Sequence, residues 1–167
     1  DLMNIRKSYK SLINWGKRSM TFDVYDEGNV TEEIFEKFEN FHIETSKRRT
    51  RSHESWMLQY DAVTKGMGYV VLGYLEGNLA TAILILSGKK ECFYGVCVNR
   101  RDLMEEHKPV GHATLLKSIM VAKEKGFEIF NIGNVTNRVD PKANDIVLYQ
   151  RGFNTILDAK LTFEANI

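Results

Sequence analysis

The sequence predicts an α/β domain with one mixed, mostly antiparallel central sheet and helices on both faces. Its 167 residues fit one domain with a full-sized core. Three strand-like segments, 68–75, 79–86 and 91–98, follow one another closely and are joined by tight turns. The passage from the third segment through a helix to a strand at 127–132 requires a parallel crossover, which makes the sheet mixed.

The other elements follow from periodicity and capping signals. Apolar residues at helical spacing predict a helix over 3–18, and alternation predicts a strand over 20–25. Thr31 and Ser52 stand where helix N-caps are expected, and Pro109 precedes a long helix. The segment 79–86 is apolar on both faces, so we expect it at the centre of the sheet. The full set of further predicted elements is a helix opened by Thr31, a helix from Ser52 to about 65, helices over 110–125 and 141–151, and a last strand over 156–163.

Composition excludes some classes of protein. Hydrophobic residues make up 43%, charged residues 27%, and the formal net charge is +1, which argues against a general nucleic-acid coat protein. No apolar run approaches the ~20 residues that span a bilayer, and no secretion signal precedes the first helix, so we expect a cytoplasmic location. The chain begins at Asp1 and is treated as one domain over 1–167; the second domain of a longer protein is the alternative.

The two cysteines, Cys92 and Cys97, lie in one predicted strand, an odd number of positions apart. Because side chains of a strand alternate between faces, we expect the two thiols on opposite faces of the sheet. Two buried thiols in a reducing compartment are the expected state, with neither a disulfide nor a metal site.

Two motifs carry a resemblance to a known superfamily. Lys108-Pro-Val-Gly111-His-Ala113 opens the long helix, and Leu148-Tyr149-Gln-Arg-Gly152-Phe153 ends the last helix. Together with the order of the elements, they resemble the acyl-CoA loop and the C-terminal motif of the GNAT acyltransferases. The resemblance implies the GNAT fold and acyl-CoA as the donor. Lys108 replaces the usual Gln or Arg, and the second motif is one residue shorter than the common form.

A narrower resemblance covers nearly the whole chain. Arg6-Lys-Ser-Tyr-Lys-Ser-Leu-Ile-Asn14, Arg51-Ser-His-Glu-Ser-Trp56 and Phe130-Asn-Ile-Gly133 are similar to segments of the FemAB-like branch. That branch includes the FemABX ligases, which use aminoacyl-tRNA, extend peptidoglycan precursors and commonly have two such domains in tandem. Gln150 stands where the branch often has Lys, which departs from the peptidoglycan pattern.

The start of the long helix is the candidate donor site. Its first N–H groups have no partner within the helix and favour negative charge, so they suit the pyrophosphate of coenzyme A. Gly111 allows close approach of a ligand to the backbone, Ala113 is small for the same reason, and Lys108 adds a point charge. The alternative is a helix start with nothing bound. The full set of expected donor-binding residues is Lys108, Val110, Gly111, His112 and Ala113, with Cys97, Val98 and Asn99 where the superfamily polarises the thioester carbonyl.

Tyr149 is the candidate general acid, because a phenol can protonate the leaving thiolate. The alternative is a core aromatic residue packed beside Phe153. A general base is harder to choose, and the candidates are Glu54, His112 and Asp102. Each also has an ordinary structural alternative. Glu54 could cap its helix or pair with a charge, His112 could be a half-buried helix residue, and Asp102 could be a solvated loop charge. A chain of water molecules could replace all three.

The basic run from Lys47 to Arg51 is either a solvated loop or a site for phosphates of a substrate. Arg51 and Trp56 are the candidate acceptor-binding residues, because they belong to a family-like motif. We therefore expect an N-acyltransferase that moves an acyl group from acyl-CoA to an amine, with acetyl as the first candidate for the acyl group. The acceptor is expected to be a small molecule or one linked to a sugar or to the cell envelope. The alternatives are a FemABX-type transferase that uses aminoacyl-tRNA, and a non-catalytic GNAT-like binding module.

Overall fold

The computed structural model describes residues 5–133, 141–153 and 156. They belong to two compact units: residues 11–134 form the larger, and residues 1–10 together with 135–167 form the smaller. Helix α1 (Lys7–Ser19) begins in the smaller unit and ends in the larger. The organisation of the chain as a single domain stays a prediction.

Most element bounds agree with the prediction to within one or two residues. The short helix α4 was not predicted, and the predicted strand 156–163 lies outside the described residues except for Ile156. After α1, the structure has β1 (Met20–Tyr25), α2 (Glu32–Ser46), α3 (His53–Thr64), β2 (Gly68–Leu75), β3 (Asn78–Ser87), β4 (Glu91–Asn99), α4 (Arg101–Glu105), α5 (Val110–Glu124), β5 (Ile129–Asn131) and α6 (Pro141–Arg151).

The predicted caps are formed. The Thr31 side chain accepts a hydrogen bond from the N–H of Ile34 at the start of α2, and Ser52 accepts one from Ser55 at the start of α3. Each of these bonds satisfies one N–H that a helix start leaves without a partner. The turn between β2 and β3 has positive φ at Glu76 and Gly77, the conformation of a tight hairpin turn.

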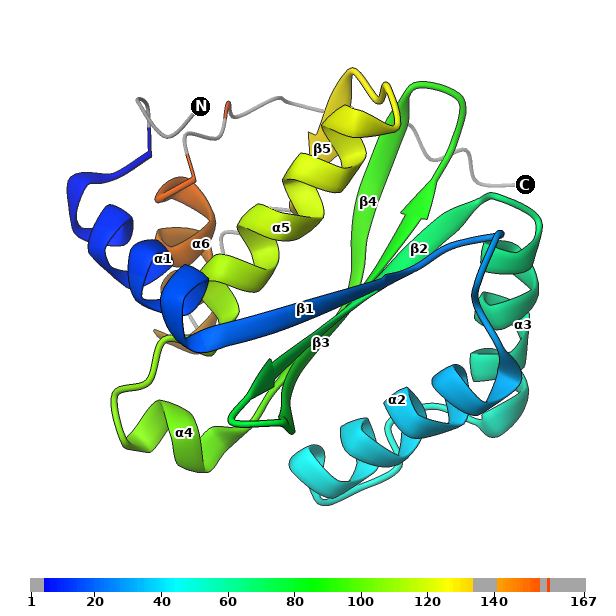
Figure 1. The fold of residues 1–167 in the computed structure, drawn as a ribbon, viewed down its shortest axis with the longest axis horizontal. Coiled ribbons are helices and arrows are strands. Elements are labelled where there is room, and N and C mark those ends of the chain that lie inside the picture. Colours follow the sequence, from blue (N-terminus) through cyan, green and yellow to red (C-terminus); the bar gives the residue numbers. More distant parts are fainter. Residues whose placement is uncertain (1–4, 134–140, 154–155, 157–167) are drawn as a thin grey trace, which may run out of the picture. The chain divides into compact units, whose positions relative to one another are not determined.

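The described strands form one five-stranded sheet in the order β1-β2-β3-β4-β5 (Figure 1). The first three pairings are antiparallel and the β4–β5 pairing is parallel. The mixed sheet and the central place of β3 are confirmed. The short parallel pairing between β4 and β5, at one edge of the sheet, lies beside the candidate site.

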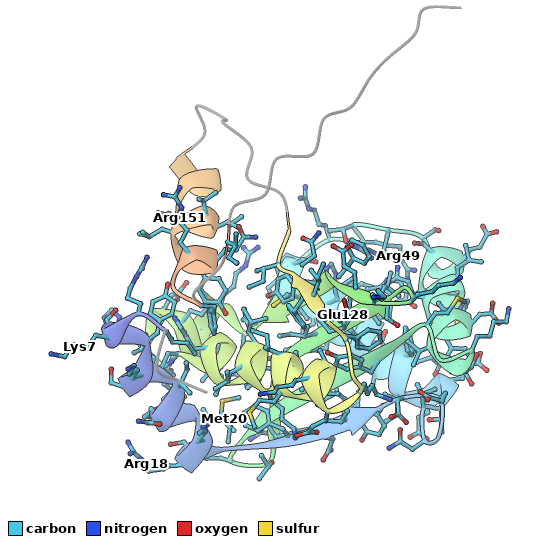
Figure 2. The ribbon with its side chains drawn as sticks, turned by 90° about the horizontal axis from the view of Figure 1, so that it is seen from above. Lys7, Arg18, Met20, Arg49, Glu128 and Arg151 are labelled. Atoms are coloured by element: carbon cyan, nitrogen blue, oxygen red, sulfur yellow. The ribbon has the colours of Figure 1, made fainter. Side chains whose placement is uncertain are left out.

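Helices cover both faces of this sheet. On one face, α2 and α3 pack Phe35, Phe38 and Trp56 into one buried cluster with apolar side chains of β2, β3 and β4. Helix α5 packs on the opposite face, where the buried Tyr69 hydroxyl of β2 donates to the Ser118 carbonyl at 2.6 Å. Figure 2 shows the side chains that fill these layers.

A bulge in β4 corrects the expectation for the two cysteines. Leu84 of β3 pairs with Val96 and Ile85 pairs with Tyr94, so Gly95 is the extra residue. The extra residue shifts the alternation of side chains by one position. Cys92 and Cys97 therefore point to the same face, the α5 face, and not to opposite faces; both thiols are free.

The smaller unit holds an aromatic cluster. The Tyr9 ring lies 6.1 Å from the Tyr149 ring and 5.5 Å from the Phe153 ring, centroid to centroid. The N–H of Arg6 donates to the carbonyl of Gly152 at 2.9 Å. A Cβ placed on Gly152 would overlap the Tyr9 ring, which explains glycine at this position of the motif.

Candidate functional site

Among the residues that the structure describes, strands β4 and β5 pair only at their amino ends. At their amino ends, Lys90 Nζ pairs with Glu128 Oε1 at 2.8 Å and the Glu128 N–H donates to the Lys90 carbonyl at 2.9 Å. The ladder ends with Phe93 opposite Asn131. β4 continues to Asn99 without pairing to β5, whose strand stops at Asn131. The parallel pairing predicted from the crossover is confirmed, and it ends well before the carboxyl end of β4.

Polar side chains follow the open part of β4 on the α5 face. The Asn99 Nδ2 lies 3.6 Å from Cys97 Sγ, and Tyr94 also hydrogen-bonds this sulfur. Burial raises the pKa of the Cys97 thiol to about 11, so the thiol is neutral near pH 7. The Asn99 Oδ1 is buried and has no hydrogen-bond partner in the structure. Because a buried carbonyl oxygen normally has a donor, this atom points to a group that completes the site.

The start of α5 lies directly against the end of β4. A Cβ placed on Gly111 would lie 3.2 Å from both amide atoms of Asn99. No side chain caps this helix, but the N–H groups of Val110 and His112 donate to the carbonyls of Lys108 and Pro109 at 2.9 and 3.3 Å. A phosphate at this helix start would therefore compete with these local hydrogen bonds, so fewer N–H groups are available to it than the motif alone implied.

Two further residues of the donor motif have partners of their own. Lys108 Nζ forms an ion pair with Glu106 Oε2 at 2.7 Å, which raises the Lys108 pKa. Ala113 is buried, and a Cβ on Gly16 of α1 would overlap its methyl group. The contact between α1 and α5 is thus one reason for the small size of Ala113, and the expected approach of a ligand stays a prediction.

The candidate bases differ in environment. Burial lowers the pKa of His112, partly opposed by its hydrogen bond with the Pro109 backbone, so its ring is neutral and able to accept a proton near pH 7. Glu54 is exposed in the first turn of α3. Asp102 is exposed and paired with Arg100, which lowers its carboxyl pKa and fits a solvated charge. Tyr149 belongs to the smaller unit, and its ring is half-buried beside Phe153.

The basic loop between α2 and α3 is anchored by a buried carboxylate. Glu39, only 5% exposed, accepts hydrogen bonds from Arg49 Nη1 and His53 Nδ1, both at 2.7 Å. Figure 2 labels Arg49, beside α3. Arg51, between these two anchors in the sequence, lies with its guanidinium 5.2 Å from the centroid of the Trp56 ring. Trp56 itself is 1% exposed, so its ring supports Arg51 from within the core.

Sequence reasoning missed two polar residues of α2, Glu39 and His42. One available signal was a carboxylate between Phe38 and Phe41 on an otherwise apolar helix face, since buried carboxylates are normally paired. His42 packs edge-on against Trp56 at 5.5 Å, and its Nδ1 is buried without a partner. The part of α2 near this loop is therefore more polar than its pattern suggested.

No three His, Cys, Asp or Glu side chains in ranges 5–133 and 141–153 gather as metal ligands would. None of the helices described here has the length and apolar character that crossing a bilayer requires.

Comparison with solved structures shows which fold this is. An aminoglycoside acetyltransferase from an uncultured soil metagenomic sample, in complex with sisomicin, matches with a TM-score of 0.62 at 13% identity, over 90% of this chain and 98% of that one. AAC(6')-Iy, in complex with a CoA-linked bisubstrate analogue, matches with a TM-score of 0.62 at 6% identity, over 89% and 99%. The ribosomal-protein-alanine N-acetyltransferase of Brucella melitensis biovar Abortus matches with a TM-score of 0.58 at 9% identity, over 89% and 100%.

The chain has the fold of the GNAT N-acetyltransferases, as the motifs predicted. At these low identities the likeness shows the fold alone. No protein-family model matches the sequence, and no curated protein matches it.

Proposed function

We propose that this protein is an N-acyltransferase that moves an acyl group, with acetyl as the first candidate, from acyl-CoA to an amine of a small molecule. The observation that carries the proposal is the open edge of β4 beside the start of α5, where Asn99 lies against Gly111. An extended thioester needs such a gap between strands, with backbone N–H groups on one side and a helix start for its phosphates.

In this proposal the donor binds along residues of both elements. Its carbonyl lies near Cys97, Val98 and Asn99, while Lys108 and the backbone from Val110 to Ala113 receive the phosphates. The Val98 side chain points into the α2–α3 cluster, so Val98 contributes its backbone. The buried Asn99 Oδ1 supports this placement, because a donor group on the ligand would satisfy it.

The chemistry assigned to the chain is proton transfer. The amine attacks the thioester carbonyl, the C–N bond forms, and the C–S bond breaks with release of the thiolate. Tyr149 is the proposed acid for that thiolate, and His112 or Glu54 the proposed base for the amine. The lowered pKa of His112 favours it, because a neutral imidazole has one unprotonated nitrogen that can accept a proton.

A binding measurement tests the proposal directly. Calorimetric titration of the folded chain with acetyl-CoA and with longer acyl-CoAs should show saturable binding at one site. Absence of binding to every acyl-CoA would refute the proposed donor and favour a non-catalytic module.

The FemAB-like alternative rests on the sequence motifs alone. Under it, the chain is a FemABX-type transferase that uses aminoacyl-tRNA, acts on cell-envelope or glycan-linked precursors in the cytoplasm, and forms one domain of a longer protein. The motif from Arg51 to Trp56 supports it, and Gln150 argues against the peptidoglycan role. Binding of aminoacyl-tRNA in place of acyl-CoA in the same titrations would favour this alternative.

A further inference from the structure

Two arginines of the loop between α2 and α3 are in opposite electrostatic situations. The charge of Arg49 is neutralised by the buried Glu39 at 2.7 Å. Arg51 forms no ion pair with any carboxylate of the described residues; its one hydrogen bond goes from Nη1 to the amide oxygen of Gln59, at 3.4 Å. A guanidinium has five N–H donors. Most of the hydrogen-bonding capacity of Arg51 is therefore available to a ligand.

This guanidinium is held in place before any ligand arrives. It stacks over Trp56 at 5.2 Å, and Gln59, which contacts it, is itself oriented by a 3.5 Å hydrogen bond to the Ser55 hydroxyl. Arg49 and His53, two positions before and two after Arg51, are both fastened to Glu39. Preorganisation of this kind reduces the entropy that a flexible arginine loses when it binds a ligand.

Two basic residues near Arg51, His42 and Arg48, bring no negative charge to it. The neighbouring His42 has a pKa lowered by burial and by Arg51, so its ring is neutral, and its buried Nδ1 has no partner. Arg48 in the same loop is exposed and adds positive charge. Trp56, beneath Arg51, belongs to the same buried cluster as Val96 and Val98 of β4, the strand with the open edge.

We propose that Arg51 binds an anionic group, a carboxylate or a phosphate, carried by the amine acceptor, and that Glu39 is the residue that positions the loop for this contact. The inference rests on the proposed N-acyl transfer and adds the substrate class. The acceptor is an amine that also carries an anionic group, whereas the matched metagenomic enzyme is in complex with sisomicin. Arginine suits this role because its planar fork matches both carboxylate and phosphate oxygens.

Three amines that differ only in their second group test the proposal. O-phosphoethanolamine, β-alanine and ethanolamine share a primary amine on a two-carbon chain and end in a phosphate, a carboxylate and a hydroxyl. Each is titrated calorimetrically into the 167-residue chain at one fixed ionic strength and without acetyl-CoA. At least one anionic amine should bind tenfold or more tightly than ethanolamine, and the tighter of the two identifies the anion. Equal binding of all three would overturn the proposal.

Variants separate the specific contact from general attraction. Arg51→Ala should remove the preference for the anionic amine, and Arg51→Lys, which keeps the charge without the planar fork, should retain a smaller one. Arg48→Ala, the matched loss of one exposed positive charge in the same loop, should keep the preference within about threefold. A preference that survives in a folded Arg51→Ala, or that Arg48→Ala removes equally, would overturn the assignment to Arg51.

The positioning role of Glu39 has its own readout. Glu39→Gln keeps the side-chain shape and weakens both anchors, so anionic-amine affinity should fall by about threefold or more while ethanolamine binding stays unchanged. Unchanged affinity for the anion would refute the role of Glu39. Since none of these titrations contains acetyl-CoA, a failure here concerns the acceptor, and a failure of the acetyl-CoA titration concerns the donor.

Discussion

A charge placed at Gly111 is the sharpest test of the donor site. In Gly111→Asp, a carboxylate would stand at the start of α5, where the donor's phosphates are proposed to bind. A unit charge about 5 Å from an anion costs about 2–3 kcal/mol at an effective dielectric constant of roughly 20–40, which corresponds to roughly 30- to 150-fold in affinity. Acetyl-CoA binding, measured calorimetrically, should weaken by that range.

The structure shows that bulk must be separated from charge in this experiment. A Cβ at Gly111 already lies 3.2 Å from Asn99, so any side chain there displaces the amide and disturbs the end of β4. Gly111→Asn has nearly the same shape as Gly111→Asp without the charge, and both should lower thermal stability similarly. The prediction concerns the difference between them. If the two variants bind acetyl-CoA equally well, the charge is not felt and the phosphates do not lie at this helix start.

Three further predictions follow from single contacts. If the Tyr149 hydroxyl protonates the thiolate, Tyr149→Phe should lower turnover by ~10²–10⁴-fold with little change in donor affinity. If Tyr149 only packs in its aromatic cluster, Tyr149→Phe should stay active and Tyr149→Ala should lower the free energy of unfolding in denaturant by about 2–3 kcal/mol. Because burial puts the folded pKa of His112 and His42 below the unfolded value of about 6.5, the free energy of unfolding should be highest above that pH and fall as the pH drops below it. In urea unfolding, His112→Gln should make this free energy depend less steeply on pH, and an unchanged pH dependence would contradict the assignment. Gly16→Ala should destabilise by about 1–2 kcal/mol despite the better helix propensity of alanine, because its Cβ overlaps Ala113, and adding Ala113→Gly should restore part of the loss; a Gly16→Ala protein with a higher melting temperature would refute this packing.

The donor motif illustrates how a pattern can be right about position and incomplete about reason. Pro109 and Gly126 bracket α5 as predicted, because backbone restriction and helix capping act locally along the chain. Gly111 was expected to leave room for a ligand, and in the structure it also leaves room for Asn99, which is twelve positions away. A contact of that range depends on where β4 ends in space, and no local pattern records it.

The sequence by itself determined the elements, their order and the class of fold. The strands at 68–75 and 91–98, the caps at Thr31 and Ser52 and the turn at Gly77 depend mainly on interactions within a few residues. Each was predicted near its observed place.

Only the tertiary structure decided which charges stay available for chemistry. The bulge at Gly95 reversed the expected facing of Cys97, because one extra residue in a ladder changes the side-chain alternation beyond it. Within the run from Lys47 to Arg51 all four basic side chains look alike in the sequence. Two contacts set the arginines apart: Arg49 pairs with the buried Glu39, whereas Arg51 lies over the Trp56 ring. An ion pair of this kind depends on the packing of α2 against α3 and not on spacing along the chain.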